Sequence, residues 1–410
     1  MYRPFPTATI MDTVAGGHLY FGLEFEFYVR PVKDAEVAPD GDTRLNMKLQ
    51  KEAVLAKIAN GIQSAGLNAA MELNVHPDEF QSQLLRSTPA TSIWKNLLAM
   101  GNIPINGDAR YPGYSLWVVK DGGELIEQDG WIPVECSSPT MCHIRAANDT
   151  ERALQAIVSS AETTVRLCSP AFHVHVNQTG GAVSLKFVKR VATIVYAIED
   201  EILWELVRPF RRRANGSLAS MSSFARDPER QGESEGLKDG FQLLPNILRD
   251  NSGRQMRNLW GSNSLDDLEW QLRAVQESDT RTALALARHE HPNGRMNWTI
   301  EFRHAQSSLQ NNFFKLWMGV VLAICKISSL PDDAYSQRLT YLCNIVQSNP
   351  TLGKRKKIEL VISMLGYGFV TAEGIPVPRI EDWNQRLDLR DAGLDPDVAG
   401  NSQGNPVVLG

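Results

Sequence analysis

The sequence contains little cysteine and no paired cysteine motif. Five cysteines occur among 410 residues, an odd number, and no Cys-x-x-Cys is present. Disulfide frameworks usually show an even number of cysteines in a short secreted chain, and many zinc and redox sites use Cys-x-x-Cys. The sequence therefore favours reduced, buried thiols over a disulfide scaffold.

Long apolar runs are also missing. The strongest one, Leu316–Cys325, is ten residues long and lies between Lys315 and Lys326. A membrane-spanning helix needs about 20 apolar residues. The first residues, Met1–Pro6, lack the apolar core of a signal peptide. We therefore expect a cytoplasmic protein without a membrane partner.

Positive charge is not in excess. Lysine and arginine number 42, and aspartate and glutamate number 47, so the formal net charge is −5. This balance argues against a nucleic-acid-binding surface, and we expect no nucleic-acid partner. No internal repeat is visible, which argues against a solenoid. No segment of the sequence specifies a homo-oligomer interface.

The composition is that of an ordinary globular protein, with 43% apolar and 22% charged residues. Apolar residues with the spacing of a buried helical stripe predict six helices. These are Asn46–Ala65, Glu151–Leu167, Ser184–Val207, Asn311–Ser329, Asp332–Gln347 and Thr351–Leu365. The polar segment 227–239 is typical of an exposed loop, and the chain from Glu381 onward is typical of a polar tail that frays.

Five shorter segments alternate apolar and polar residues with a period of two, as strands with one buried face do. They are Tyr20–Arg30, Tyr114–Lys120, Trp131–Cys136, Phe172–Asn177 and Asn297–His304. Successive side chains of a strand point to opposite faces. Each segment therefore carries its chemically distinctive residues on a single face.

The first of these strands carries two glutamates. Glu24 and Glu26 share one face, about 7 Å apart, while Leu23 and Phe25 point to the other. Carboxylates this close repel each other unless a cation or a base lies between them. The pair therefore indicates either a metal site or the solvated face of an ordinary amphipathic strand.

The last two strands carry imidazole, carboxylate and guanidinium groups. His173 and His175 share a face, where they could bind a metal or phosphate oxygens or simply form a polar surface. A cupin-type metal site is disfavoured, because no carboxylate follows three or four residues after His175. Glu301 and Arg303 also share a face, which suits an ion pair or, respectively, a metal and a phosphate.

Two further carboxylates lie where strands end. Glu135 ends an apolar run just before a turn, where a carboxylate is either paired or functional. Asp121 precedes Gly122 and reads as a turn aspartate. Together the five strands would build a polar funnel floored by carboxylates. Because hard cations such as Mg²⁺ prefer oxygen ligands, this set suits a metal–nucleotide phosphate chain.

Four motifs occur in a recognisable order. They are Phe21-Gly22-Leu23-Glu24-Phe25-Glu26, Trp131-Ile132-Pro133-Val134-Glu135-Cys136-Ser137-Ser138-Pro139, Phe172-His173-Val174-His175-Val176 and Trp298-Thr299-Ile300-Glu301-Phe302-Arg303-His304. In order and spacing the sequence resembles the amidoligase family, a branch of the glutamine synthetase-like carboxylate–amine ligases. The resemblance covers roughly residues 18–330, with a variable insert at about 30–110.

The resemblance implies an α+β fold with a glutamine synthetase-like curved antiparallel sheet. Helices would pack behind this sheet, a nucleotide funnel would lie in front, and a helical C-terminal region would follow. We expect a catalytic domain over residues 1–330, a helical extension over 331–380 packed on it, and a flexible tail over 381–410.

The resemblance also implies roles for the residues at matching positions. The metal ligands would be Glu24, Glu26, Glu135, Glu301 and His173, with Mg²⁺ or Mn²⁺ as the metal. Arg303 would steady the transferred phosphoryl group, and Arg303, Glu301 and Glu24 would be the catalytic residues.

Contacts to ATP are implied at four positions. His173 would meet the phosphates, with His175 in support. Arg212 and Asn215 fall where the family has an Arg-rich segment ending in Asn, and a solvated basic turn is the alternative there.

The sequence departs from the family pattern at three places. Cys168-Ser169 replaces Cys-Gly, Asp121-Gly122-Gly123 replaces Asp-Gly-Ser, and Ser307-Ser308 replaces Gly-Thr. None of these changes removes an expected metal ligand. They bear on substrate recognition rather than on ATP use.

The implied activity is ATP-dependent formation of an amide or peptide-like bond. A small-molecule or peptide carboxylate and an amine would be the substrates, an acyl phosphate the intermediate, and ADP and phosphate the products. Two alternatives stay open, a nucleotide-binding pseudoenzyme or scaffold on the same fold and a redox-metal enzyme with His173 and His175 as ligands. We expect Glu24→Gln or Glu301→Gln to abolish turnover. Because clustered carboxylates repel, we expect neither change to destabilise the metal-free protein.

Overall fold

The structure is a computed structural model of the chain. It describes residues 19–31, 43–71, 116–122, 130–141, 146–161, 163–164, 170–178, 183–207, 241–251, 253–273, 282–290, 296–309, 311–347, 351–366 and 378–393. The predicted loop at 227–239 and the predicted ATP contacts Arg212 and Asn215 lie outside these ranges.

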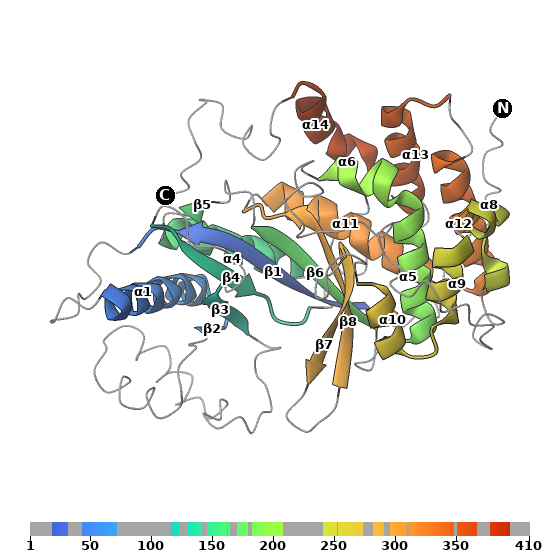
Figure 1. Cartoon of the computed structure of the whole chain (residues 1–410). Helices are drawn as coiled ribbons and strands as arrows, with labels where there is room; N and C mark the ends of the chain where they lie inside the picture. The colour runs from blue at the N-terminus through green and yellow to red at the C-terminus, as the bar shows by residue number, and fades with distance from the viewer. Residues whose placement is uncertain are drawn as a thin grey trace.

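One sheet organises the fold (Figure 1). Its strands are β1 (Leu19–Val29), β2 (Ala69–Met71), β3 (Trp117–Asp121), β4 (Ile132–Ser137), β5 (Thr163–Thr164), β6 (Ala171–Gln178), β7 (Leu284–Glu290) and β8 (Met296–Gln306). Their order is β2-β3-β4-β1-β6-β8-β7, with β5 also paired to β1. Every pairing is antiparallel except that of β2 with β3. The predicted α+β fold with a mostly antiparallel sheet is confirmed, and β1, β3, β4, β6 and β8 correspond to the five predicted strands.

The strands bury one face because their apolar residues alternate with polar ones. In β1, Leu23, Phe25 and Phe27 are at most 1% exposed. In the neighbouring β6, Phe172 and Val174 are completely buried, and the rings of Phe172 and Phe25 stack with centroids 4.8 Å apart. Burying such side chains contributes about 1.5–3 kcal/mol each. This packing fixes which face of the sheet carries the polar residues.

Helices cover the buried face of the sheet, with α4 and α11 behind it and most of the later helices gathered to one side (Figure 1). The helices are α1 (Thr43–Ser64), α4 (Ala146–Ser160), α5 (Leu185–Ile198), the π-helix η2 (Glu199–Leu203), α6 (Trp204–Leu206), the 3₁₀ helix η5 (Phe241–Leu243), α8 (Asn246–Asn251), α9 (Gly253–Gly261), α10 (Leu265–Gln271), α11 (Asn311–Ser328), α12 (Asp332–Val346), α13 (Lys354–Gly366) and α14 (Ile380–Asp391). α1 packs on α4, α12 packs on α5, and α13 packs on α11. Lys315 of α11 pairs with Glu151 of α4 at 3.0 Å.

The helix predicted for Glu151–Leu167 was wrong at its C-terminal end. α4 ends at Ser160, and the chain then forms the short strand β5, which pairs with the end of β1. Thr163 and Thr164 are β-branched, and such side chains fit a pleated sheet better than a helix. The partner strand therefore prevails over the helical pattern of the preceding residues.

The frayed tail predicted from residue 381 was also wrong in its first part, because α14 is a helix packed on the protein. Trp383 and Leu387, one turn apart, are at most 1% exposed. Arg355 of α13 donates hydrogen bonds to Asn384 at 2.9 Å and to Asp388 at 3.1 Å. Apart from Ile380 and Leu389, the rest of α14 is polar, so its apolar stripe is too narrow to stand out in the sequence.

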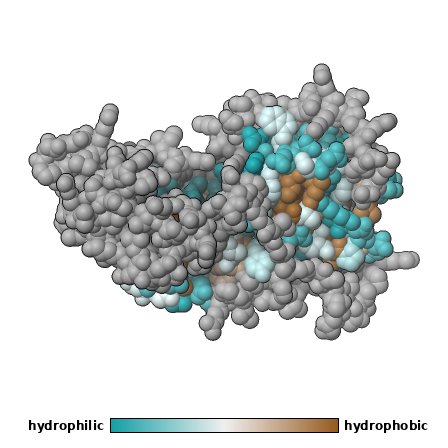
Figure 2. Space-filling view, turned by 90° about the horizontal axis from the view of Figure 1, so that it is seen from below, coloured by the Kyte–Doolittle hydropathy of each residue, from teal (hydrophilic) through white to brown (hydrophobic). Residues whose placement is uncertain are grey.

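The helical side of the molecule shows apolar residues bordered by hydrophilic ones (Figure 2). Among the described residues, Trp270 of α10 is the large hydrophobic side chain that stays exposed, at 47%. None of the described helices combines the length and the apolar character needed to cross a membrane.

Candidate functional site

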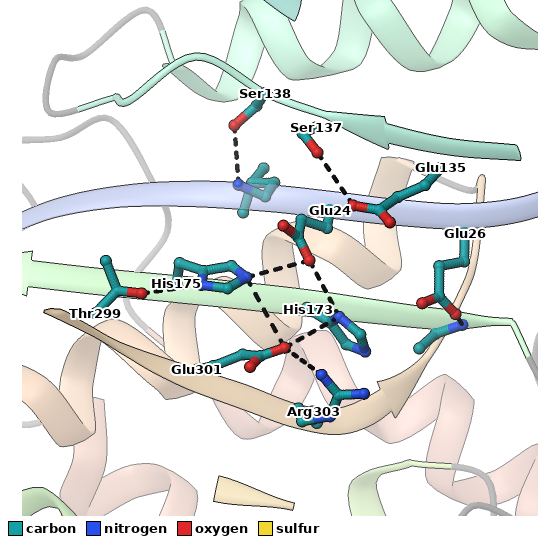
Figure 3. Close-up of polar contacts among 12 residues, drawn as sticks. Glu24, Glu26, Glu135, Ser137, Ser138, His173, His175, Thr299, Glu301 and Arg303 are labelled. Carbon is teal, nitrogen blue, oxygen red and sulfur yellow. Dashed lines mark hydrogen bonds and ion pairs between the residues drawn. The ribbon is translucent and has the colours of Figure 1, made fainter. Parts of the chain in front are cut away.

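The register of the sheet brings the predicted site residues into a compact group. Glu24 of β1 lies opposite His173 of β6, and His175 of β6 lies opposite Glu301 of β8. On the other side of β1, Glu26 lies opposite Glu135 of β4. Directly opposite residues of antiparallel strands have Cβ atoms about 4.5–5.5 Å apart. Figure 3 shows these side chains on the same face of four neighbouring strands.

Two imidazoles and two carboxylates form the centre of the group. His173 Nδ1 lies 3.2 Å from Glu24 Oε2 and 3.3 Å from Glu301 Oε1. His175 Nε2 lies 3.2 Å from the same Glu24 oxygen and 3.9 Å from the same Glu301 oxygen. Each of these carboxylate oxygens is therefore shared by both imidazoles (Figure 3).

Two further residues of β8 hold this centre in place. Arg303 NH1 donates to Glu301 Oε1, the oxygen that both imidazoles approach. His175 Nδ1 lies 3.0 Å from the hydroxyl of Thr299. Thr299, Glu301 and Arg303 alternate along one strand, so a single extended segment supplies an acid, a guanidinium and a support for the imidazole.

The second pair of carboxylates is satisfied differently. Glu26 is 8% exposed, and its Oε2 accepts a hydrogen bond from the backbone N–H of Ala171 at 2.8 Å. Glu135 Oε1 lies 2.9 Å from Lys120 Nζ and accepts from the hydroxyl of Ser137 at 3.2 Å. These contacts offset part of the repulsion between the Glu26 and Glu135 carboxylates.

The Ser-Pro turn after β4 anchors the strand that carries Glu24. The hydroxyl of Ser138 accepts a hydrogen bond from the N–H of Leu23 at 2.8 Å, and the N–H of Ser138 donates to the Leu23 carbonyl at 2.8 Å. A serine here extends the ladder between β1 and β4 by one pair of contacts. The motif therefore fixes the backbone next to a site carboxylate.

The charges of the central carboxylates and imidazoles shift one another's pKa values. Burial raises the pKa of Glu24, but the charge of His175 and hydrogen bonds to both imidazoles outweigh it, so this pKa lies well below its ordinary value. Burial also raises the pKa of Glu301, yet the charges of His175, Arg303 and His173 bring it to about 2. Burial lowers the pKa of His175, but Glu24 and Glu301 raise it to about 9. Without a bound cation, the centre therefore holds ionised glutamates and a protonated His175.

Glu135 is in the opposite situation. Burial and the charge of Glu24 raise its pKa, and Lys120 opposes them. The ionised form of this carboxylate is thus disfavoured by its surroundings and depends on a neighbouring positive charge.

The central residues fit a divalent cation. Ligand atoms of Glu24, His173 and Glu301 all lie within 4.8 Å of one another. Ligands at right angles on a cation with bonds of about 2.1 Å would be about 3.0 Å apart, close to the 3.2 and 3.3 Å that separate His173 Nδ1 from the two carboxylate oxygens. His173 Nε2 is buried without a hydrogen-bond partner among the described residues, so a ligand could still satisfy it.

The structure thus brings Glu24, His173, His175, Glu301 and Arg303 together, and it places Glu26 and Glu135 on the same face beside them. The proposed roles of these residues stay predictions. Sequence reasoning missed Lys120, which it treated as the end of a strand. Its position opposite Glu135 follows from the register of β3 and β4, and a single sequence does not reveal register.

Comparisons with known proteins add little. No family model matches the chain, and no curated protein matches it significantly. Among solved structures, the chain is similar to the crystal structure of the complex between the prokaryotic ubiquitin-like protein Pup and its ligase PafA. That match has 8% identity and a TM-score of 0.35, and it covers 97% of this chain and 72% of that chain. A similarity this low establishes neither a shared fold nor a shared activity.

Proposed function

We propose that this protein is an ATP-dependent carboxylate–amine ligase. One observation carries the proposal: Glu24, His173 and Glu301, from three adjacent strands, form a group that suits a divalent cation, and Arg303 is bound to its edge. Three of the four motifs that resemble the amidoligase family supply these residues, and the remaining motif supplies Glu135 on the same face. Geometry and motif thus point to the same chemistry.

The proposed reaction has two steps. The carboxylate of a small-molecule or peptide acid attacks the γ-phosphorus of ATP, and ADP leaves. The amine then attacks the resulting acyl phosphate, an amide forms, and phosphate leaves. Both partners of the first step are anionic, so their repulsion is a large part of its barrier.

The residues of the site would lower this barrier. Glu24, His173 and Glu301 would hold Mg²⁺ or Mn²⁺, which when bound would screen the phosphate charges. Arg303 is already oriented by Glu301, so its guanidinium would be in position for the oxygens of the moving phosphoryl group. Thr299 would keep the His175 ring in place through its contact with Nδ1.

The test is to supply ATP, Mg²⁺, candidate acids and a generic amine such as hydroxylamine. ADP release, with ¹⁸O passing from the labelled carboxylate into phosphate, is the expected result. AMP and pyrophosphate would contradict the acyl phosphate, and ATP binding without turnover in a broad screen would favour a nucleotide-binding scaffold. Glu381→Gln, an exposed change on α14, is the matched control for Glu301→Gln.

A redox-metal enzyme is the second candidate, and the arrangement of His175 favours it. Its Nε2 points to the carboxylate oxygens, while its Nδ1 is held by Thr299, as the outer nitrogen of a metal-bound histidine usually is. Two imidazoles with a carboxylate suit iron, and imidazole ligands also suit copper. Stoichiometric iron or copper in the purified protein would favour this function, whereas exchangeable Mg²⁺ or Mn²⁺ would favour the ligase.

A further inference from the structure

Strand β8 is irregular at the position of the site arginine. Its register with β6 shifts by one residue between Phe172 and Val174, so two residues of β8 share the single position opposite His173. These two residues are Arg303 and His304. A bulge leaves its extra residue out of the regular ladder of hydrogen bonds, and bulges often lie beside active sites, where they redirect a side chain. The position of the bulge must therefore be fixed by other contacts.

The two residues of the bulge are held on opposite faces of the sheet. Arg303 faces the site, where its guanidinium donates to Glu301 (Figure 3). Its backbone N–H donates to the carbonyl of Ala283, just before β7, at 2.8 Å. His304 faces the core, where its Nε2 lies 2.9 Å from Glu199 Oε1 and both side chains are at most 1% exposed. The bulge is thus anchored from both faces.

Glu199 provides the directional contact of the His304 ring. The rings of Trp204 and Trp317 lie 5.1 and 5.8 Å from the imidazole at tilted angles. His304 Nδ1 and the Nε1 atoms of both tryptophans are buried without a hydrogen-bond partner in the part of the chain that the structure describes. The tryptophans therefore confine the imidazole by packing alone. A hydrogen bond has a preferred angle, so the contact with Glu199 also sets the direction of the ring.

Glu199 itself comes from an irregular helix. It is the first residue of η2, the π-helix that lies between α5 and α6. Single π-turns within α-helices are rare and are frequent at functional sites. The buried pair thus joins an irregularity of the helical layer to an irregularity of the sheet, and the sheet irregularity includes Arg303.

We propose that His304 and Glu199 are positioning residues for Arg303, because they fix the bulge from the core face and so direct the guanidinium at phosphate oxygens. This inference deepens the proposed function and rests on it in so far as Arg303 binds phosphate. The pair lies on the core face and would act only through β8. Its loss would loosen Arg303 without removing any side chain of the site face, and a small misplacement of a binding group can cost much of its effect.

The experiment measures the affinity of the full-length protein for inorganic tripolyphosphate, with Mg²⁺ present, by titration calorimetry. Arg303→Met is expected to weaken binding about tenfold or more, because charge-assisted hydrogen bonds to phosphate oxygens are lost. His304→Phe combined with Glu199→Leu replaces the buried pair by apolar side chains of similar size, which folded proteins often tolerate. This apolar double variant is expected to weaken binding about five- to tenfold.

Two further variants separate positioning from a purely structural role. In the Arg303→Met background, the apolar double replacement is expected to cause no further weakening, because the arginine through which the pair acts is already gone. Glu199→Gln keeps an oxygen that can accept from His304, so it is expected to bind tripolyphosphate within about twofold of wild type.

Tyr335→Phe is the matched control. Tyr335 of α12 is completely buried, and its hydroxyl donates to the Arg190 carbonyl of α5 at 3.2 Å. The substitution removes a buried polar contact between two helices and leaves β8 unchanged. It is expected to bind tripolyphosphate like wild type.

Wild-type affinity in the apolar double variant, with circular dichroism showing it folded, would overturn the inference. Further weakening in the Arg303→Met background would overturn it too, because the pair would then act by another route. Either result leaves the proposed ligase activity standing, since ADP release is measured separately. Conversely, a protein that releases no ADP with any substrate but shows the expected pattern of affinities would contradict the ligase and support the positioning role.

Discussion

The sheet carries histidine–glutamate contacts on both of its faces, and the two arrangements are built differently. On the core face, His304 Nε2 of β8 lies 2.9 Å from Glu199 Oε1, and both side chains are at most 1% exposed. The rings of Trp204 and Trp317 lie 5.1 and 5.8 Å from the imidazole. Among the described residues, His304 is matched to a single carboxylate in an aromatic enclosure.

On the site face, the carboxylate oxygens are shared. Glu24 Oε2 lies 3.2 Å from each of two imidazoles, and Glu301 Oε1 is approached by His173 and Arg303. When a metal ion replaces one nitrogen donor beside such an oxygen, the other nitrogen donor can stay in contact with it. A buried imidazole with one carboxylate partner, as at His304, indicates a structural pair. A buried carboxylate oxygen that several nitrogen donors approach, as at Glu301, indicates a binding site.

The largest expected effect is on the core face. His304→Ala leaves Glu199 buried without its imidazole, and breaking such a pair costs about 3–5 kcal/mol. Urea denaturation should show this loss in the free energy of unfolding. Glu199→Gln retains a hydrogen-bonding group and should cost less. If His304→Ala is as stable as wild type, the pair is not structural and the comparison fails.

Glu301→Gln tests the site face. We expect ADP release to fall about 100-fold or more, because the substitution removes a cation ligand and the partner of Arg303. For stability, the structure leads to the opposite expectation from the sequence. The low pKa of Glu301 shows that attraction to His175 and Arg303 outweighs repulsion, so the change should destabilise the metal-free protein. Urea denaturation without metal decides the sign.

The pH dependence of stability sharpens the same comparison. The pKa of His175 is about 9 in the folded protein, above its ordinary 6.5. The stabilisation that protonated His175 provides is therefore complete below pH 6.5 and is lost as the pH rises through 9. We expect metal-free wild type to lose about 1–3 kcal/mol over this window relative to His175→Gln. Parallel pH profiles for the two proteins would contradict the raised pKa.

At the acid end the sign reverses. The pKa of Glu301 is about 2 in the folded protein, below its ordinary 4.5. The stabilisation that ionised Glu301 provides is therefore complete above pH 4.5 and is lost as the pH falls through 2. Glu301→Gln should therefore be less sensitive to acid than wild type between these values.

The smallest expected effect lies in the helices behind the sheet. A Cβ on Gly61 of α1 would lie 2.7 Å from Ser160 Cβ and 3.2 Å from the Ala156 carbonyl of α4. Gly61→Ala should therefore cost about 1 kcal/mol, even though alanine favours a helix. A Cβ on Gly353 meets nothing within 4 Å, so Gly353→Ala is the control. Both variants should bind Mn²⁺ like wild type, because the change lies away from the site face.

The sequence was most informative where alternation and burial coincide. In β1, β6 and β8 the apolar residues fix the face, so Glu24, His173 and Glu301 had to share the other one. The register of the strands could not be predicted from the sequence, because it depends on which strands pair. The role of Lys120 and the strand β7 were therefore not predicted, and α14 was missed because Trp383 and Leu387 form too narrow a stripe.

The order of the strands also determines when the cluster can exist as the chain leaves the ribosome. Glu24 is synthesised early, whereas Glu301 arrives with β8, after most of the other strands. Until β8 docks, β6 presents its imidazoles beside an open edge. Cation capture would therefore mark the closing stage of assembly, and a chain truncated before Met296 would lack both the final ligand and the strand that shields the edge.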